Sequence, residues 1–276
     1  MIPRILIIAG SDSGGGAGIQ ADIKTITMLG GHAMTAITAI TAQNTQGVTA
    51  VHPVPVEMVM AQIEAVVSDI GVDAVKIGMI GSAEIARAIA ARLDPALPRH
   101  ADAPPVRVVF DPVMVATSGS RLADDETIDA FEALMRRATL VTPNIPELEL
   151  LTGLKITDYD GLIDAALALG ERIGTAVLAK GGHMQGDRVT DVLFAGKRTR
   201  LGTAWTDPRI DTPHNHGTGC TLASGIAAGL GAGLSLEAAI DRARNYVRAA
   251  LLAAPGLGKG HGPMGHAMGI VPFDRL

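Results

Sequence analysis

The sequence predicts an α/β protein in which a mostly parallel β-sheet is covered by helices on both faces. Short apolar runs alternate with amphipathic stretches from one end of the 276-residue chain to the other, and this alternation is typical of strand–helix–strand units. The chain is 47% hydrophobic, which is enough to bury a large core. No linker or shift in composition divides it, so we expect a single domain over residues 1–276, with a Gly-rich tail from about residue 255.

Runs of strand length and of helix length define the predicted elements in chain order. The first run, RILIIAG, is apolar throughout, as expected for a strand buried on both faces. The amphipathic stretch after the first glycine-rich segment is closed by Gly30 and Gly31, which favour a helix end, and the next helix follows two prolines. The predicted strands are 4–10, 33–43, 74–78, 106–111, 140–144, 175–180, 188–194 and 197–201, and the predicted helices are 18–29, 56–70, 82–93, 217–231 and 235–254.

Charge and cysteine content exclude several classes of function. The net charge is −5, and the arginines are scattered rather than gathered on one face, so we expect no nucleic acid partner. A single cysteine excludes an internal disulfide and suits a reducing compartment. The N-terminal apolar run is too short for a signal peptide. These observations together predict a cytoplasmic protein.

One uncharged stretch, residues 217–236, could be mistaken for a membrane span. Glycine, alanine, serine and threonine make up most of it, and these residues gain little from lipid. Its larger apolar residues recur every fourth position beside a row of small ones. The apolar row is Leu222, Ile226, Leu230 and Leu234, and the small row is Thr221, Gly225, Gly229 and Gly233. We therefore expect a helix packed closely against a neighbour in a protein core, and no membrane partner.

Polar and glycine residues gather where the predicted strands end. Ligands of parallel α/β sheets bind at the carboxyl ends of the strands, so these segments predict the position of a site. The segments are GSDSGGGAG, TAQNTQG, KIGM, DPVMVATSG, TPNIPE, AKGGH and HNHGTGC.

The segment HNHGTGC, at the start of the helix over 217–231, predicts an anion site. Gly217 and Gly219 carry no side chains, so consecutive N–H groups around Thr218 can point at one anion, reinforced by the helix dipole. A phosphoryl group in transfer is a suitable guest. Cys220 lies in the first turn, where the pKa of a thiol falls, and is placed to accept a proton from an attacking hydroxyl or to orient it. The alternative is that Cys220 is a small packing residue.

Two acids and a lysine predict a metal–phosphate site at the same sheet edge. Asp111 ends a buried strand and Glu147 opens a short helix, and Mg²⁺ usually binds through one or two carboxylates and waters. Lys180 ends a strand and is followed by Gly181 and Gly182, an arrangement suited to a phosphate. The alternatives are that Asp111 caps a turn and that Glu147 only favours the helix dipole.

Other classes of site fit the sequence less well. The segment SDSGGGAGIQA satisfies G-x-G-x-x-A, but it does not follow its strand at once and no acid lies about 20 residues further on. Neither a P-loop nor a G-x-S-x-G elbow occurs. His214, His216 and Cys220 could ligate a metal, but a zinc site usually adds a second close pair. A Cys–His hydrolase needs its histidine from a distant segment, whereas His216 lies just before the helix.

Taken together, these segments resemble the hydroxymethylpyrimidine/phosphomethylpyrimidine kinases of thiamine biosynthesis, in the ribokinase-like superfamily. The resemblance covers about residues 4–265, and AGSDSGGGAGIQADIKT, TAQNTQGV, KIGM, DPVMVATSG, TPNIPE, KGGH and HGTGCT occur in the order of that family. It implies a three-layer α/β/α ribokinase-like fold, ATP and Mg²⁺ as cofactors, and a homodimer.

The resemblance also implies roles for individual residues. Gln43 would hydrogen-bond the aminopyrimidine, and its partners in the substrate pocket would be Gly10, Asp22, Met79 and Val113. The matches elsewhere are Asp111 and Glu147 at the metal, Lys180 and Asn144 beside ATP, Gly217, Thr218 and Gly219 as the anion hole, and Cys220 as the catalytic residue. Two positions depart from the family pattern, Asn215 before the histidine and Ser120 in the segment TSGS.

The implied reaction is ATP-dependent phosphorylation of 4-amino-5-hydroxymethyl-2-methylpyrimidine to its monophosphate and then to its diphosphate. A pyridoxal or pyridoxine kinase on the same fold is the nearest alternative, because both substrates are small heteroaromatic rings with a hydroxymethyl group. The second alternative is a non-catalytic protein that binds a vitamin or an anion. The presence of Asp111, Glu147, Lys180 and Cys220 argues against that alternative.

Overall fold

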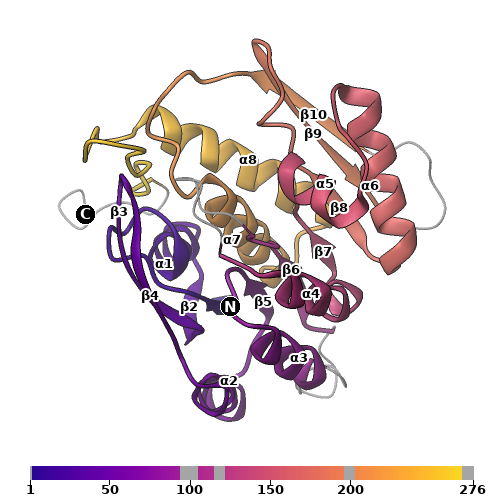
Figure 1. Cartoon of the computed structure of the whole chain (residues 1–276). Coiled ribbons are helices and arrows are strands. Elements are labelled where there is room, and N and C mark those ends of the chain that lie inside the picture. Colours follow the sequence, from indigo (N-terminus) through magenta and orange to yellow (C-terminus); the bar gives the residue numbers. More distant parts are fainter. Residues whose placement is uncertain (1, 94–104, 115–121, 196–202, 269–276) are drawn as a thin grey trace.

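An eight-stranded sheet forms the centre of the protein (Figure 1). The computed structural model describes residues 2–93, 105–114, 122–195 and 203–268. The strand order is β10-β9-β8-β7-β6-β5-β1-β2. The strands are β1 (Arg4–Ala9), β2 (His32–Ile37), β5 (Ala74–Ile77), β6 (Arg107–Phe110), β7 (Leu140–Val141), β8 (Ala176–Ala179), β9 (Arg188–Phe194) and β10 (Thr203–Pro208). The helices are α1 (Gly18–Met28), α2 (Val56–Asp69), α3 (Ala83–Arg92), α4 (Asp125–Arg137), α5 (Ile145–Thr152), α6 (Tyr159–Ile173), α7 (Thr218–Gly231) and α8 (Leu236–Leu252).

Helices cover both faces of this sheet. Neighbouring strands are parallel from β2 to β8, and β9 and β10 add an antiparallel edge. Helices α2 to α6 pack on one face, and α1, α7 and α8 pack on the other (Figure 1). In β1, Leu6 and Ile8 belong to the first core and Ile5 and Ile7 to the second, because successive side chains of a strand point to opposite faces. The predicted three-layer α/β/α fold with a mostly parallel sheet is confirmed.

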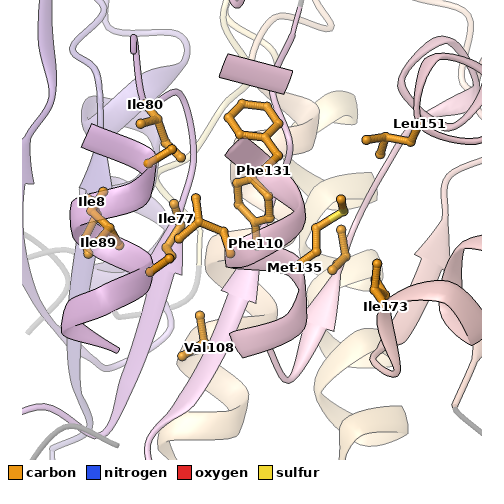
Figure 2. Packing of buried hydrophobic residues seen from close by; sticks show 14 of the residues in the cluster. Ile8, Ile77, Ile80, Ile89, Val108, Phe110, Phe131, Met135, Leu151 and Ile173 are labelled. Carbon is orange, nitrogen blue, oxygen red and sulfur yellow. The ribbon is translucent and has the colours of Figure 1, made fainter. Parts of the chain in front are cut away.

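Aromatic packing joins the middle of the sheet to its helical layer. The rings of Phe110 at the end of β6 and Phe131 in α4 are both fully buried, and they meet edge to face with centroids 5.2 Å apart (Figure 2). This edge-to-face geometry is favoured by the ring quadrupoles. The contact holds the end of β6 in place directly before Asp111.

The predicted strand over 33–43 was wrong as one element, because it divides between two sheets. Its first half is β2, and its second half is β3 (Ala39–Asn44), which pairs antiparallel with β4 (Gly47–Pro53) in a separate two-stranded sheet. The chain changes direction at buried Thr38, whose hydroxyl donates to the Met79 carbonyl at 2.6 Å. The triplet Ala-Ile-Thr is repeated on both sides of this point, over residues 36–41, so no local sequence signal marks the break.

Several helices and strands of the structure were not predicted from the sequence. Helices α4 and α6 were not predicted, although Asp124 and Asp158 cap them by accepting N–H bonds from Thr127 and Gly161. The strand β4 and the edge strand β10 were also not predicted, and the predicted strand over 197–201 lies outside the described residues. Capping signals of this kind are local and could have identified both helices.

The predicted close approach of α7 to a neighbour is confirmed for its middle turns. A Cβ on Gly225 or Gly229 would lie 2.9 Å from the Cβ of Ala243 or Ala239 in α8. The predicted row of small residues ends at Gly229, because Gly233 lies beyond the helix and has a φ of +89°. Leu234, predicted as part of the apolar row, is likewise beyond the helix and partly exposed. None of the described helices is long and apolar enough to cross a membrane.

A valine in place of Gly225 is expected to destabilise the fold by about 1–3 kcal/mol, because overpacking forces two well-packed helices apart. The matched control is Asn245→Val, which places the same side chain on an exposed position of α8. The free energy of unfolding is measured in urea for both variants. A Gly225→Val variant as stable as Asn245→Val would contradict the close packing.

Candidate active site

A cavity of about 600 Å³ lies at the carboxyl ends of several parallel strands, beside the first turn of α7. This volume is typical of small-molecule sites. Its wall contains all but one of the predicted site residues, namely Gly10, Gln43, Met79, Asp111, Val113, Asn144, Glu147, Lys180, Gly217, Thr218, Gly219 and Cys220. The exception is Asp22. The strand-end segments therefore converge on one place, as their position in the predicted sheet implies.

The wall of the cavity after β1 and β5 is formed by closely fitted backbone. The Gly10 N–H donates to the Met79 carbonyl at 3.1 Å, and a Cβ on Gly10 would lie 2.9 Å from the Met79 Cε. Gly10 thus leaves the space that the Met79 thioether occupies. Gln43 reaches the wall from β3, at a bulge where the pairing with β4 shifts between Ala42 and Gln43. Bulges of this kind redirect a side chain.

Asp22 lies behind the cavity wall and not in it. Its carboxylate is fully buried in α1 and accepts two bonds from Lys76 Nζ at 2.8 and 3.0 Å and one from Ser224 Oγ at 2.7 Å. Lys76 itself lines the cavity. The predicted direct contact of Asp22 with substrate therefore does not match its position. The spacing in the sequence could not reveal this, since the position of Asp22 depends on β5 and α7.

Burial alone would lower the pKa of Lys76, but the negative charge of Asp22 and the nearby Cys220 and Asp111 raise it above its usual value. The ammonium therefore stays charged beneath the cavity. A buried cation of this kind requires its counter-charge.

Asp111 and Lys180 form a second ion pair, at the ends of β6 and β8. Lys180 Nζ lies 2.7 Å from Asp111 Oδ1, which also accepts from the Thr142 hydroxyl at 2.9 Å. Burial raises the pKa of Asp111, but Lys180 and Lys76 lower it by more, so the carboxylate is ionised. A Cβ on Gly219 would lie 3.3 Å from both Asp111 Oδ2 and Lys180 Nζ. The first turn of α7 thus lies directly against this pair.

Glu147 has a structural and a candidate metal-binding role at once. Asn144 and Glu147 form a capping box at α5, in which each side chain accepts the backbone N–H of the other, at 2.9 Å and 2.8 Å. Glu147 therefore supports the helix start through a capping box, which goes beyond the dipole interaction considered from the sequence. Glu147 nevertheless lines the cavity, and burial, reinforced by the charge of Asp111, raises its pKa to about 7. The positive charge near this carboxylate, from Lys180, is therefore not enough to keep its pKa at the usual value.

The carboxylate pair of Asp111 and Glu147 fits a magnesium ion held partly through water. Asp111 Oδ2 faces Gly219 and has no hydrogen-bond partner among the described residues. A cation there would stabilise the charged form of Glu147. Within the described ranges no cluster of three or more His, Cys, Asp or Glu side chains could hold a metal. Two carboxylates with waters suit Mg²⁺, whereas zinc needs more protein ligands.

The first turn of α7 has the geometry of an anion site. Gly217 precedes the helix with φ of +87°, and a Cβ there would collide with the Gly16 carbonyl, so only glycine fits. The backbone N–H groups of Gly219 and Cys220 have no acceptor among the described residues. Unpaired N–H groups at a helix N-terminus attract an anion.

The Cys220 thiol lies in this turn, but its pKa moves in the opposite direction to the prediction. Burial, assisted by the charges of Asp22 and Asp111, raises the pKa of the thiol to about 11 against the opposing effects of Lys76 and the Gly18 N–H. The expected lowering by the helix N-terminus is overturned mainly by burial of the thiol. Cys220 is therefore a neutral thiol near neutral pH.

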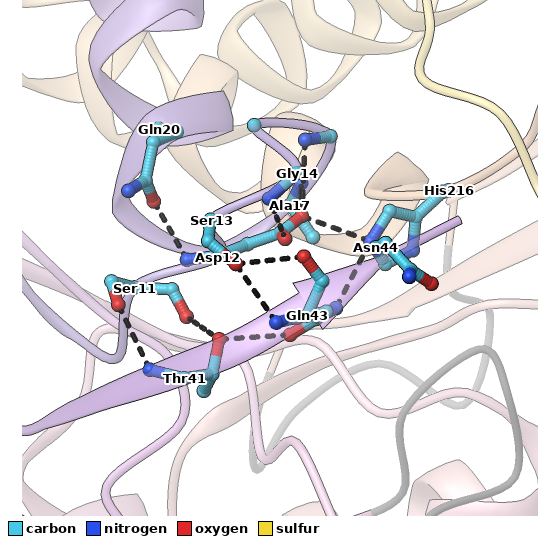
Figure 3. Close-up of polar contacts among 12 residues, drawn as sticks. Ser11, Asp12, Ser13, Gly14, Ala17, Gln20, Thr41, Gln43, Asn44 and His216 are labelled. Carbon is cyan, nitrogen blue, oxygen red and sulfur yellow. Dashed lines mark hydrogen bonds and ion pairs between the residues drawn. The ribbon is translucent and has the colours of Figure 1, made fainter. Parts of the chain in front are cut away.

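Asp12, Lys76 and His216 also line the cavity, although they were not among the predicted site residues. Asp12 closes the glycine-rich loop by accepting N–H bonds from Gly14, Gly16 and Ala17 at 2.8 to 3.0 Å (Figure 3). His216 Nε2 lies 3.0 Å from Asp12 Oδ2. The acid–glycine pattern after β1 is a signal of such a turn, whereas the contact with His216 joins residues 204 positions apart.

The two departures from the family pattern have different outcomes. Asn215 Oδ1 lies 3.2 Å from His261 Nδ1 at the surface. Ser120 lies outside the described residues, as does the whole segment VATSG.

The sequence profile described as phosphomethylpyrimidine kinase matches residues 12–265. The chain belongs to this family. The hydroxymethylpyrimidine/phosphomethylpyrimidine kinase of Bacillus subtilis is 45% identical over 267 residues, covering 96% of this chain and 95% of that protein. Membership in the phosphomethylpyrimidine kinase family makes this protein a kinase.

Two further comparisons show how the family fold is used. The thiamine biosynthesis bifunctional protein ThiED of Geobacter sulfurreducens is 48% identical over 265 residues, and the chain spans about half, 52%, of that longer protein. The pyridoxal kinase of Staphylococcus aureus, in complex with AMP-PCP and pyridoxal, superposes with a TM-score of 0.84 at 31% identity, covering 100% of this chain and 96% of that chain. A pyridoxal kinase thus shares the architecture of this chain.

Replacing Lys76 with methionine is expected to cost about 3–5 kcal/mol of folding free energy, because it leaves the Asp22 carboxylate buried without a counter-charge. The double variant Lys76→Met/Asp22→Asn removes both charges, keeps an acceptor for Ser224, and should recover most of the loss. Urea unfolding midpoints measure the effect. Equal stability of the single and double variants would contradict the ion-pair interpretation.

Alkylation of Cys220 by iodoacetamide is expected to be about 100-fold slower than for an ordinary thiol near pH 7.5, because only the thiolate reacts and the pKa of this thiol is raised to about 11. The rate should keep rising with pH from 9 towards 11, where an ordinary thiol levels off. Since Cys220 is the only cysteine, the total label on the protein, followed by mass spectrometry, gives the rate of its alkylation. The unfolded chain is the control. A plateau below pH 9 would contradict the raised pKa.

Proposed function

We propose that this protein uses ATP to phosphorylate 4-amino-5-hydroxymethyl-2-methylpyrimidine to its monophosphate and then to its diphosphate, in thiamine biosynthesis. The observation that carries this proposal is one cavity with two kinds of wall. Gly10, Gln43 and Met79 offer apolar and amide contacts for a ring, while Gly219 and Lys180 offer donors for phosphate. The names of the relatives in B. subtilis and G. sulfurreducens support the same substrate class.

In this proposal each site residue binds a substrate, positions another side chain or stabilises charge in the transition state. Gln43 hydrogen-bonds the ring, with Gly10, Met79 and Val113 around it, and Asp22 acts indirectly by holding Lys76 in place. The N–H groups of the turn from Gly217 to Cys220 receive the transferred phosphoryl group. Lys180 and Asn144 lie on the ATP side. Charge on the equatorial oxygens of a loose transition state is what such donors stabilise.

Magnesium would be held by Asp111 and Glu147. When bound, it neutralises charge on the ATP phosphates and orients them for in-line transfer. Lys180 already neutralises the charge of one of the two acids, Asp111. The remaining negative charge of the Asp111–Glu147 pair suits a single divalent cation.

Cys220 is proposed to orient the attacking group and not to act as a thiolate base. Its raised pKa keeps the thiol protonated near neutral pH, and a loose transition state needs little help from a base. The second acceptor, a phosphate monoester with a second pKa of about 6, is already an anion. The same anion-binding turn then serves both phosphorylations.

The remaining proposals concern the state of the protein in the cell. We propose a single-domain, cytoplasmic homodimer. The lone cysteine supports a reducing compartment. Exposed apolar side chains of the β3–β4 hairpin and α2, namely Ile40, Val51 and Met58, support a subunit contact.

A pyridoxal kinase is the second candidate, because the S. aureus pyridoxal kinase covers the whole of this chain with a TM-score of 0.84. Its substrate also carries a hydroxymethyl group on a heteroaromatic ring. The alternative of a vitamin- or anion-binding protein without turnover is not supported, because the chain belongs to a kinase family and keeps the acids and lysine of the phosphate wall.

ATP consumption with Mg²⁺ tests these candidates, using the hydroxymethylpyrimidine, its monophosphate, pyridoxal and pyridoxine as acceptors and resolving products by mass. Both pyrimidines are expected to reach the diphosphate, with kcat/KM about tenfold or more above that for pyridoxal. Turnover of pyridoxal alone would establish the second candidate. Ligand binding without ATP turnover would contradict the proposed function.

A further inference from the structure

The Gln43 carboxamide lies between two polar partners in the cavity wall (Figure 3). One end lies 3.1 Å from His216 Nε2 and the other lies 3.3 Å from the Thr41 hydroxyl. A carboxamide has a donor end and an acceptor end, so its orientation decides which of the two a bound ring meets. The surrounding hydrogen bonds determine that orientation.

The first constraint comes from Asp12, through His216. Burial raises the pKa of the Asp12 carboxyl, but bonds from His216 and from the Ala17 and Gly14 N–H groups lower it by more. Asp12 is therefore an ionised carboxylate, which can only accept hydrogen bonds. Since His216 Nε2 lies 3.0 Å from Asp12 Oδ2, Nε2 must carry a proton. The end of Gln43 that faces this Nε2–H is then an acceptor.

The second constraint comes from Thr41 and is independent of the first. The Thr41 hydroxyl donates its single proton to the Ser11 carbonyl at 2.8 Å. It has only lone pairs left for Gln43, so the end of the carboxamide that faces Thr41 must be the NH₂ group. Both constraints require the oxygen of Gln43 to face His216, which exchanges the two ends relative to the orientation drawn in Figure 3.

The ring of His216 is itself held in position by packing. A Cβ on Gly16 would lie 2.6 Å from His216 Cδ2, so the imidazole lies directly on the glycine-rich loop whose N–H groups Asp12 holds. The His216 backbone N–H donates to the Gly262 carbonyl at 3.2 Å. Neither the ring nor the carboxylate can turn away without opening this loop.

We propose that Asp12 and His216 are specificity-determining residues that fix the donor–acceptor order of Gln43. This inference rests on the proposed function, in which Gln43 recognises the ring. In the aminopyrimidine, the 4-amino donor lies next to the N3 acceptor, which matches a carboxamide with oxygen at His216 and nitrogen at Thr41. The 4-oxo analogue presents the reverse order, an acceptor next to an N3–H donor. Wild-type protein should therefore reject it.

The protonation of His216 is tested first, on the free wild-type protein. Long-range proton–nitrogen NMR correlations report which ring nitrogens carry protons, and the His216→Gln variant assigns the His216 signals among the eight histidines. A protonated Nε2 is expected. An unprotonated Nε2 would overturn the inference whatever the protein phosphorylates.

The consequence for specificity is tested by calorimetric titration with the aminopyrimidine and its 4-oxo analogue. In His216→Leu, which cannot donate to Asp12 or Gln43, the ratio of the two dissociation constants should fall about tenfold or more, since a reversed carboxamide is no longer penalised. His216→Gln, which keeps a donor, should restore most of the ratio. Equal weakening of both ligands in His216→Leu would indicate a merely structural role and overturn the inference.

Failure of the proposed function gives a different result. Wild-type protein that binds neither pyrimidine, while His216 Nε2 is protonated, would refute the pyrimidine assignment. The donor order of Gln43 would in that case still be supported by the spectrum.

Discussion

The close approach of the glycine-rich loop after β1 to the first turn of α7 is the constraint on which the site depends. The Gly16 carbonyl occupies the space that a side chain on Gly217 would need. Two residues on, the Gly18 N–H interacts with the Cys220 thiol, and the Asp12–His216 contact closes the other side. Backbone at this distance excludes side chains, so glycine is required on both segments. The same absence of side chains leaves N–H groups available to an anion.

Charge beneath the cavity is arranged as two ion pairs near the carboxyl ends of β5, β6 and β8. Lys76 of β5 is paired with Asp22 of α1, and Lys180 after β8 is paired with Asp111 after β6. The two lysines keep Asp111 ionised despite burial, while Glu147 remains poorly compensated. Burial, together with the charges of Asp22 and Asp111, keeps the thiol of Cys220 neutral. The electrostatics of the site are therefore a collective property, which no single segment would display alone.

Much of the candidate site could be predicted because it is built from strand ends. Asp111, Lys180 and the HGTGC turn each follow an apolar run or begin a helix, and parallel strands bring such ends to one edge. Asp22 was assigned to the substrate pocket by resemblance, yet it turns inward to Lys76 because Ser224 and β5 lie behind it. Asp12 and His216 were not assigned any role, since their contact spans most of the chain.

The sequence by itself determined the layered α/β architecture, the glycine turn before α7 and the residue types at the strand ends. These features are local, set by periodicity, capping and the conformational freedom of glycine. Only the tertiary structure decided that the segment after β2 leaves the main sheet at Thr38, that Cys220 is a neutral thiol, and which way the Gln43 carboxamide faces. Each of these depends on burial and on hydrogen bonds between segments far apart in the chain, and such contacts exist only once the layers have packed.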